Sequence, residues 1–350
     1  MDAHRFNIGP EDQILVTGAG GFIGRRLVRQ LLEYGFRNIR CFVRSSGDPG
    51  WIESLRRYGE GARLEFVYGN LLNRDDCAAA CKDVAVVLHL AAGRGEKSYP
   101  DAYLNSAITT RNLMIACSQS PALVRFLNVS SFTVYSNRNG RLLDETSAVE
   151  QRPEARGEAY CFAKVKQEEI VREYGERLAI PYVIMRPGVV YGPGNEPING
   201  RVGTGTFGIF LHLGGGNTVP LTYVDNCAEA IVLAGVTKGI DGEAFNIVDD
   251  DLPSSRHFLS LYKKHVKHFR SIYVPHALSY VLCYGWEYYS AASKRQLPPV
   301  FNRARWRANW RRTTYSNRKA KERLGWTPKV PTIVGLQRYF SACRYEEQHA

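Results

Sequence analysis

The chain has 350 residues, of which 44% are hydrophobic and 23% are charged, and this is the composition of an ordinary globular protein. No run reaches the roughly 18 uncharged apolar residues of a membrane-spanning helix, and we do not expect the polar segment Met1–Gln13 to act as a secretory signal. The eight cysteines are scattered without a zinc-binding spacing, so we expect reduced thiols, a cytoplasmic location and no metal site.

Short apolar segments alternate with helical patterns along the first half of the chain. Strands are expected at Gln13–Thr17, Asn38–Val43, Leu64–Tyr68, Val84–Leu90, Arg125–Val129 and Pro181–Met185. Helices are expected at Phe22–Tyr34, Ala102–Cys117 and Glu158–Leu178. Repeated strand–helix–strand units predict the α/β class, with a doubly wound parallel sheet that is covered by helices on both faces.

A glycine-rich loop, Thr17–Gly24, directly follows the first expected strand. Gly18, Gly21 and Gly24 permit a tight turn, close approach of the backbone to a pyrophosphate, and close packing of helix on strand. The helix that follows presents unpaired N–H groups and the positive end of its dipole to that pyrophosphate. This loop predicts a Rossmann-type core over residues 11–186 that binds a nicotinamide dinucleotide.

The end of the second strand usually selects between the two nicotinamide cofactors. An acidic residue there would hold a ribose 2′-hydroxyl, whereas an arginine accepts a 2′-phosphate. The sequence places Arg44 at this point, followed by Ser45, and has no acidic residue before Asp48. This favours NADP(H) over NAD(H), although Arg44 could also be a plain solvated charge at the end of a strand.

Tyr160 and Lys164 stand four residues apart at the start of an expected helix, so the phenol and the ammonium share one helical face. An unperturbed tyrosine has a pKa of about 10, and a neighbouring cation lowers it. Such a tyrosine can exchange a proton with a substrate hydroxyl as a hydride is transferred. Ser131, which follows the strand Arg125–Val129, is the candidate hydroxyl that holds the substrate oxygen.

The glycine-rich loop, the Ser131 segment and the Tyr160–Lys164 pair, in this order, resemble the extended short-chain dehydrogenase/reductase superfamily. This superfamily includes the NAD-dependent epimerases and dehydratases, and the resemblance runs from Ile14 to about Leu336. Further similar segments are Gly69–Leu72, His89–Ala92, Thr110–Leu113, Arg186–Gly194, Thr222–Ala230 and Leu324–Pro328. Asn70 stands where the family usually has an aspartate. The resemblance implies that Ser131, rather than Ser130, takes the catalytic position, and that the protein is a homodimer.

These interpretations together assign the site. The catalytic residues are Tyr160, Lys164 and Ser131. The cofactor is expected to contact Gly18, Gly21, Phe22, Ile23, Gly24, Arg44, Asn70, Leu71, Leu90, Ala91, Ala92, Val129, Tyr160, Lys164, Pro187, Gly188 and Val189. The substrate is expected to contact Thr133, Tyr191, Asn195 and Arg305. Residues 187–345 are expected to form a smaller, mostly helical substrate lobe, with residues 220–250 returning to the core.

Differences from the family pattern reduce the number of reactions that the protein is expected to catalyse. The sugar-nucleotide 4,6-dehydratases carry Asp-Glu after the catalytic hydroxyl residue, whereas this chain has Phe132 and Thr133, so that elimination is not expected. The segment Leu221–Asn226 looks like the 3β-hydroxysteroid dehydrogenase and dihydroflavonol reductase branch. The first hypothesis is an NAD(P)-dependent epimerase or oxidoreductase of a nucleotide sugar, and the second is a reductase of a sterol-like, lipid or polyketide ketone. A non-catalytic dinucleotide sensor is a third.

The net charge of +12 is concentrated late in the chain, since residues 252–321 hold fifteen Lys or Arg and a single acid, Glu287. Such a field favours an anionic partner, which is a phosphate-bearing small-molecule substrate, an acidic membrane surface or nucleic acid. No nucleic-acid-binding module is recognisable, so nucleic acid is not expected as a partner. For the uncharged stretch Ser271–Trp286 we expect packing in the core, and the alternative is contact with an anionic membrane surface.

Overall fold

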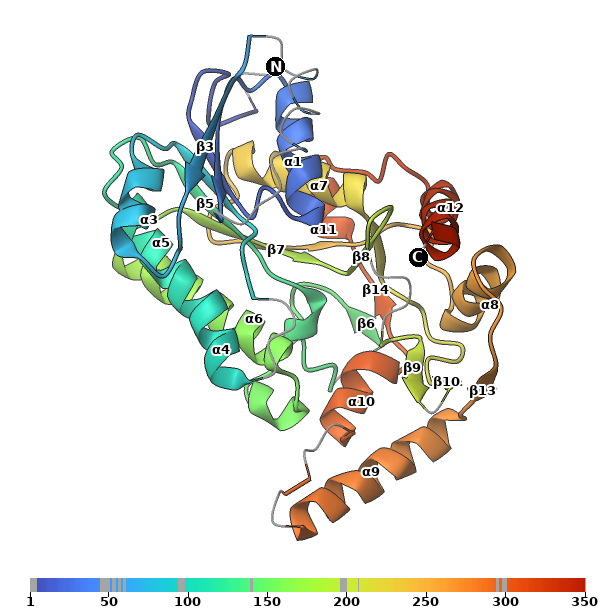
Figure 1. Cartoon of the computed structure of the whole chain (residues 1–350). Helices are drawn as coiled ribbons and strands as arrows, with labels where there is room; N and C mark the ends of the chain where they lie inside the picture. The colour runs from blue at the N-terminus through green and yellow to red at the C-terminus, as the bar shows by residue number, and fades with distance from the viewer. Residues whose placement is uncertain are drawn as a thin grey trace.

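The structure is a computed structural model that describes residues 5–44, 51, 55, 58, 61–93, 98–138, 141–195, 200–206, 208–293, 296, 297 and 301–349. Its centre is a seven-stranded parallel sheet (Figure 1). In spatial order the strands are β3 (Arg63–Tyr68), β2 (Asn38–Val43), β1 (Ile14–Thr17), β4 (Val86–His89), β5 (Arg125–Val129), β7 (Tyr182–Pro187) and β12 (Ala244–Ile247). The expected Rossmann-type fold class is confirmed.

Helices cover both faces of this sheet, as Figure 1 shows. One face carries α1 (Phe22–Glu33) and α7 (Val224–Val236), with α11 (Arg318–Leu324) against α7 and β12. The other face carries α3 (Arg74–Cys81), α5 (Thr109–Cys117) and α6 (Ala159–Arg177). The helix α4 (Tyr99–Tyr103) runs into α5 through a π-helical turn, Leu104–Ile108.

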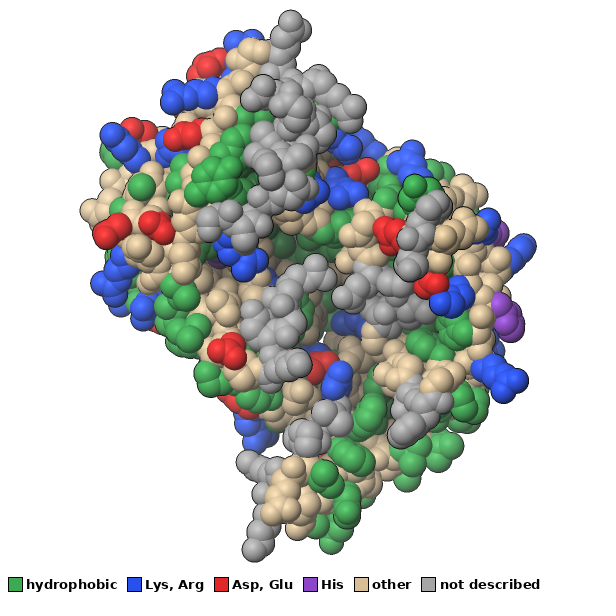
Figure 2. Space-filling model, in the orientation of Figure 1, with side chains coloured by type: hydrophobic (Ala, Val, Ile, Leu, Met, Phe, Trp, Pro, Cys, Tyr) green, Lys and Arg blue, Asp and Glu red, His purple; other side chains and the backbone are tan. Residues whose placement is uncertain are grey.

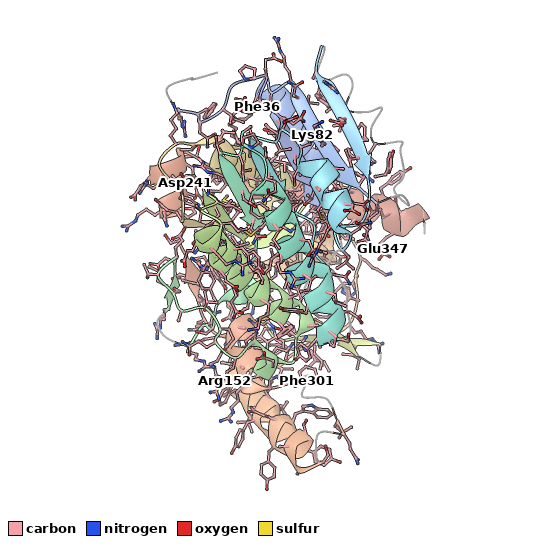
Figure 3. All side chains as sticks on the ribbon, turned by 90° about the vertical axis from the view of Figure 1, so that its left-hand side faces the viewer. Phe36, Lys82, Arg152, Asp241, Phe301 and Glu347 are labelled. Atoms are coloured by element: carbon pink, nitrogen blue, oxygen red, sulfur yellow. The ribbon has the colours of Figure 1, made fainter. Side chains whose placement is uncertain are left out.

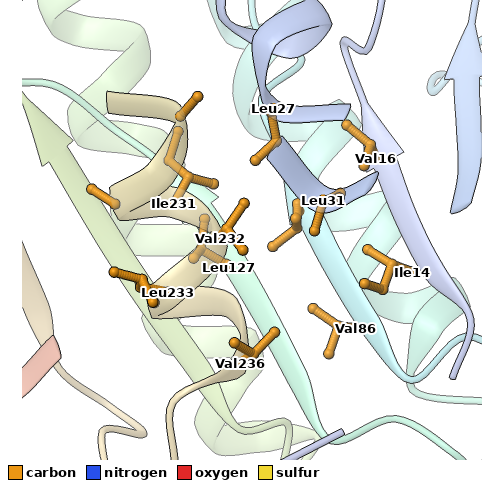
Figure 4. Close-up of a cluster of buried hydrophobic side chains, with 14 of the residues drawn as sticks. Ile14, Val16, Leu27, Leu31, Val86, Leu127, Ile231, Val232, Leu233 and Val236 are labelled. Carbon is orange, nitrogen blue, oxygen red and sulfur yellow. The ribbon is translucent and has the colours of Figure 1, made fainter. Parts of the chain in front are cut away.

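The strands β1, β4, β5, β7 and β12 are largely buried on both faces because most of their positions are apolar, and alternate side chains enter different cores. Val16, Leu88 and Leu127 pack under α1 and α7, whereas their neighbours Leu15, Val87 and Phe126 pack under α3, α5 and α6. Figure 4 shows the first of these cores, in which Leu27 and Leu31 of α1 lie beside Ile231 and Val232 of α7 over the same face of the sheet. This rigid sheet fixes the positions of the loops at its carboxyl edge.

The remaining elements form a second body beside that edge (Figure 1). Its helices are α8 (Ser255–His265), α9 (His276–Ala292), α10 (Arg303–Trp310) and α12 (Thr332–His349). A three-stranded sheet of β9 (Gly203–Thr206), β10 (Ile209–His212) and β13 (Ser271–Tyr273) joins them. Two short strand pairs connect the bodies, namely β8 (Val189–Tyr191) with β11 (Leu221–Tyr223), and β6 (Leu142–Leu143) with β14 (Thr314–Tyr315).

The expectation of core packing for Ser271–Trp286 is wrong. In the structure this stretch is β13 followed by most of α9, and Ile272, Val281 and Leu282 are all more than half exposed. Figure 3 shows α9 projecting from the end of the molecule near Phe301. The apolar composition predicted burial, but α10 covers only one side of α9. Among the described residues, no helix has both the length and the apolarity to cross a membrane.

Candidate active site

The loop between β1 and α1 has a shape that only glycine permits. Gly18 has a φ of +72°, and a Cβ there would lie 3.0 Å from the backbone nitrogen of Ala91, which follows β4. A Cβ on Gly24 would overlap the carbonyl oxygen of Gly18. The first turn of α1 is therefore packed directly on the loop, between the ends of β1 and β4.

The N-terminus of α1 is suited to an anion. Gly21 is the N-cap, it makes no side-chain capping hydrogen bond, and the first turn contains no acidic residue. Phe22, Ile23 and Gly24 begin the helix, where backbone N–H groups lack helical partners. These donors and the positive end of the helix dipole fit a pyrophosphate, and no carboxylate competes with it.

Other predicted cofactor residues follow neighbouring strands at the same edge of the sheet. Arg44 directly follows β2 and is exposed, whereas Ser45 lies outside the described residues. The side-chain oxygen of Asn70, after β3, accepts a hydrogen bond from the backbone of Leu72 at 3.0 Å. Leu71 beside it is buried. Because the sheet is parallel, these loops and Leu90, Ala91 and Ala92 after β4 lie at one edge of the sheet, where this fold binds its ligands.

The ends of β5 and β7 complete this edge. Val129 is the last residue of β5, and Pro187 is the last residue of β7. Gly188 donates a hydrogen bond to the carbonyl of Ile247 at 2.9 Å, and a Cβ on it would overlap the carbonyl oxygen of Pro220. The backbone of Val189 therefore runs close beside the segment before β11, with no room for a side chain at position 188.

Two hydrogen bonds place the start of α6 against the end of β5. The ammonium of Lys164 donates to the carbonyl of Val129 at 2.8 Å, and the thiol of Cys161 donates to the carbonyl of Thr133 at 3.3 Å. Lys164 is only 3% exposed, whereas Tyr160, one turn earlier, is 42% exposed. The structure therefore brings Tyr160 and Lys164 to the loop that carries Ser131.

The two adjacent serines after β5 have different environments. Ser130 is buried, and its hydroxyl donates a hydrogen bond to Glu168 on α6 at 2.6 Å. The hydroxyl oxygen of Ser131 accepts a hydrogen bond from the backbone of Thr133 at 3.2 Å and caps the short helix Phe132–Val134. Because Ser131 accepts this bond, its O–H group remains able to donate to a substrate oxygen, and its catalytic role stays a prediction.

A buried polar network behind Lys164 was not predicted from the sequence. Lys164 donates to the side-chain oxygen of Gln167 at 2.9 Å, and the amide of Gln167 donates to the hydroxyl of Thr110 at 2.9 Å. The hydroxyl of Thr110 also bonds His89 at 2.9 Å, and His89 bonds Thr17 at 2.7 Å. Lys164 is thereby connected, through side chains alone, to the strand that begins the glycine loop.

The imidazole in this network is neutral. Burial, with a smaller contribution from the charge of Lys164, lowers the pKa of His89 to about 3. A neutral imidazole has one donor and one acceptor nitrogen, which matches its two hydroxyl partners. The single cation in the chain from Lys164 to Thr17 is therefore the ammonium, and Gln167 is the side chain that holds it in place against Val129.

We expect Gln167→Leu to lower kcat about tenfold, because Lys164 loses a neutral acceptor that fixes its position. The pH profile should move to higher pH in the oxidative direction, since a displaced ammonium favours the phenolate less. The comparison variant Glu169→Leu removes a surface carboxylate of the same helix and should change neither quantity. A lower melting temperature with an unchanged pH profile would instead show a purely structural role for Gln167.

A second buried cluster fixes α6 to β7. The guanidinium of Arg186 forms two hydrogen bonds with Glu168, at 2.6 and 2.8 Å, and a third with the hydroxyl of Tyr135 at 2.9 Å. The hydroxyl of Tyr135 in turn donates to Asn246 of β12 at 2.7 Å. Arg186, the first residue of the Arg186–Gly194 segment, therefore holds α6 in place through Glu168. Ser130 belongs to the same cluster, since it also bonds Glu168.

The four predicted substrate residues do not converge. Thr133 lies beside Ser131, and Arg305 pairs with Glu158 at the start of α6 at 3.1 Å, so both are near Tyr160. Tyr191 is 3% exposed and donates to the carbonyl of Thr332 at 3.3 Å.

Tyr191 packs against Tyr223 and Tyr339, and burial raises the pKa of its phenol well above the ordinary value. A substrate contact for Tyr191 is therefore wrong, because its ring is enclosed by core side chains and its hydroxyl is already bonded to the carbonyl of Thr332. The side chain of Asn195 donates to the carbonyl of Val190 at 2.8 Å and closes its own loop.

Comparison with known proteins gives the following similarities. A model of the NAD dependent epimerase/dehydratase family matches residues 14–247. The chain is 29% identical over 251 residues to the uncharacterized UDP-glucose epimerase YtcB of Bacillus subtilis, covering 67% of this chain and 76% of that protein. It is 25% identical over 356 residues to 3beta-hydroxysteroid-dehydrogenase/decarboxylase isoform 1 of Arabidopsis thaliana, covering 93% and 78%.

Solved structures share the fold over nearly the whole chain. A UDP-glucuronic acid 4-epimerase from Bacillus cereus, in complex with UDP-glucuronic acid and NAD, superposes with a TM-score of 0.71 at 24% identity. That match covers 95% of this chain and 99% of the epimerase. The structure of gox2253 superposes with a TM-score of 0.76 at 23% identity, covering 96% and 99%.

Proposed function

The chain belongs to the NAD dependent epimerase/dehydratase family, within the extended short-chain dehydrogenase/reductase superfamily, and we propose that it is an NAD(P)-dependent oxidoreductase or epimerase. The reaction takes place at a secondary alcohol or ketone carbon. The observation that carries this proposal is the pair of hydrogen bonds, from Lys164 to Val129 and from Cys161 to Thr133, that holds Tyr160 beside the Ser131 loop.

The chemistry requires one acid–base group, one cation and one hydroxyl donor. When bound, a nicotinamide dinucleotide supplies the hydride acceptor or donor. The phenol of Tyr160 takes the proton of the substrate hydroxyl in the oxidative direction and returns it in the reverse direction. The buried ammonium of Lys164 favours the phenolate form of Tyr160. The hydroxyl of Ser131 donates a hydrogen bond to the substrate oxygen and fixes its position.

The residues around the glycine loop fit a dinucleotide. A Cβ at Gly18 or Gly24 would collide with backbone atoms, so only glycine permits this tight turn, and the first turn of α1 has no acid to repel a pyrophosphate. Arg44 follows β2 at the position where the ribose of a dinucleotide lies in this fold, and its side chain is exposed. We therefore propose NADP(H) as the preferred cofactor, with the guanidinium of Arg44 paired to the 2′-phosphate.

We expect Arg44→Gln to weaken NADP⁺ binding about tenfold or more and to leave NAD⁺ binding almost unchanged. A hydrogen bond between two charged groups contributes about 1.5–3 kcal/mol, and only NADP⁺ carries the phosphate. Calorimetric titration with the two cofactors measures both affinities, and Arg37→Gln, which changes another exposed arginine near the same end of the sequence, is the comparison variant. Equal losses for both cofactors would refute a 2′-phosphate contact.

For the substrate we propose a nucleotide sugar. The similarity to YtcB, named as a UDP-glucose epimerase, and the net charge of +12 support an anionic substrate. A thermal-shift series with UDP, dTDP and GDP in saturating NADP⁺ tests this class. One of them should raise the melting temperature beyond the cofactor alone. If none does, the nucleotide-sugar assignment fails, while the cofactor assignment stands or falls on its own titration.

An uncharged substrate is a second possibility, because two arginines of the C-terminal body are already bonded to other parts of the protein. Arg305 is held by Glu158, and Arg311 donates to the carbonyl of Asn137 at 2.7 Å, so these two cations are used within the protein. Similarity to the Arabidopsis 3beta-hydroxysteroid-dehydrogenase/decarboxylase extends over more of the chain than the similarity to YtcB. The alternative substrate is therefore an apolar ketone of the sterol or lipid kind. Enzyme-catalysed reduction of such a ketone by NADPH, with no nucleotide sugar present, would establish this class.

A further inference from the structure

The helix α9 contacts the rest of the protein through a narrow stripe. Only Ser279, Cys283 and Ser290 are buried along its 17 residues. Ser279 accepts a hydrogen bond from the indole of Trp306 on α10 at 2.8 Å. Glu287, the one acidic residue of the helix, pairs with Arg303 of α10 at 2.9 Å. These contacts anchor one side of α9 and leave its other side to solvent.

The solvent side of α9 is a continuous apolar face. Leu278, Val281, Leu282, Tyr288 and Tyr289 recur at the spacing of one helical face, and their exposed fractions are 50, 61, 58, 72 and 59%. We call these five residues the α9 face. Helical geometry adds only Gly285 and Ala292 to this side, so it carries no charge. In Figure 2 hydrophobic side chains gather over α9 at the lower end of the molecule.

Cations lie beside α9 on the helix that anchors it. The neighbouring helix α10 carries Arg303, Arg305 and Arg307 and has no acidic residue, and Glu287, the one acidic residue of α9, is already paired. Lys263 and Lys264 lie at the end of α8, near β13, which precedes α9. Arg303 lies over the ring of Tyr284, with 4.7 Å between the guanidinium carbon and the ring centroid. An apolar helical face with cations around it is the pattern of a helix that lies in the surface of a membrane.

Monomeric globular proteins rarely expose apolar patches of this kind without a partner. We propose that the α9 face docks the protein on an anionic lipid bilayer, with α9 parallel to the membrane surface. Leu278, Val281 and Leu282 enter the acyl boundary, and the tyrosines lie at the level of the headgroups, where aromatic rings with a polar tip are favoured. Lys264 of α8 and Arg307 of α10 supply the positive charge that attracts anionic headgroups.

A second copy of the chain fits this face less well. Two copies that meet through α9 would bring two basic segments together, and like charges across an interface are repelled. The helix also projects beyond the body in Figures 1 and 3, so one helix would provide most of such an interface. A bilayer offers a broad apolar layer and negative charge together, and this matches both features of the surface.

The test is co-sedimentation of the full chain with vesicles of phosphatidylcholine alone and of phosphatidylcholine with about one third phosphatidylserine. Wild-type protein should sediment with the anionic vesicles and far less with the neutral ones, and added salt should weaken the binding. The variant Val281→Asp with Leu282→Asp should lose binding at least about tenfold, because it places two carboxylates on the apolar face.

The matched control is Ile333→Asp with Tyr345→Asp, which makes the same charge change on two exposed apolar residues of α12. It should sediment like the wild type, and both variants should keep the wild-type melting temperature because all four sites are exposed. Failure of the wild type to bind anionic vesicles overturns the proposal. So does equal loss in the control, or a wild-type dimer on gel filtration that the α9 variant converts to a monomer while vesicle binding is absent.

Discussion

Tyr160→Phe should lower kcat by about two to four orders of magnitude, because positioned acid–base groups contribute about that much to a proton transfer. Cofactor affinity and melting temperature should stay near the wild-type values, since the substitution removes one oxygen from a side chain that is 42% exposed. Turnover is measured with the substrate that the nucleotide and ketone tests identify, and cofactor binding is measured by titration.

The control for this variant is Tyr99→Phe. Tyr99 packs edge-on against Phe162 of α6, with ring centroids 5.1 Å apart, so the change removes a phenol oxygen close to the same helix. Activity should remain within about twofold of the wild type, because a group without a role in the proton transfer contributes nothing to it. Full activity in Tyr160→Phe would show that another group moves the proton and would refute the assignment of Tyr160.

Gly24→Ala should weaken dinucleotide binding about 100-fold, because an added Cβ in a packed site costs up to about 3 kcal/mol when the backbone must move. The new carbon would overlap the carbonyl oxygen of Gly18 and lie 2.8 Å from the Cα of Ala19. The loop and the first turn of α1 would then separate. Titration with NADP⁺ measures the loss, and a melting curve of the free protein separates it from unfolding.

Gly20→Ala is the matched control in the same loop. A Cβ at position 20 would make ordinary contacts at 3.5–3.7 Å with the ring of Trp51, and the backbone there does not have a positive φ. We expect affinity within about threefold of the wild type, because an added methyl in an open position costs little. Equal losses in Gly20→Ala and Gly24→Ala would mean that the close approach at Gly24 is not what the cofactor site requires.

The sequence predicts those parts of the site that depend on the order and spacing of residues within one segment of the chain. Gly18, Gly21 and Gly24 occupy a tight turn between a strand and a helix, and such a turn can be recognised from the order of residues alone. The alternation of short apolar runs with helices likewise predicts the parallel sheet, because few other folds bury such strands on both faces. The four-residue spacing of Tyr160 and Lys164 places them on one helical face in any α-helix.

The sequence could not reveal contacts between distant residues. Gln167 meets Thr110 and Lys164 inside the protein, and only the packing of α6 on α5 brings the first two together. A periodic pattern could still have suggested Gln167, since it is a polar residue on the buried side of α6. Tyr191 was misassigned because its segment resembles a cofactor-side motif, whereas the side chain turns into the core under α12.

Apolar composition was misleading in the C-terminal body. The uncharged run Ser271–Trp286 predicted core packing, but a helix is buried only where another element covers it, and α10 covers one stripe of α9. Composition shows how much apolar surface exists and does not show what covers it. The same run is the basis of the proposed contact with an anionic bilayer.

The central claim is that this fold carries a nicotinamide dinucleotide on the glycine loop, and the melting temperature of the wild-type protein with NADP⁺ and with NAD⁺ tests it most directly. A ligand at a hundred times its dissociation constant adds about 2.7 kcal/mol to the free energy of unfolding. We predict a clear rise with NADP⁺ and a smaller one with NAD⁺ at the same concentration. No rise with either cofactor, up to millimolar concentration, would contradict the account.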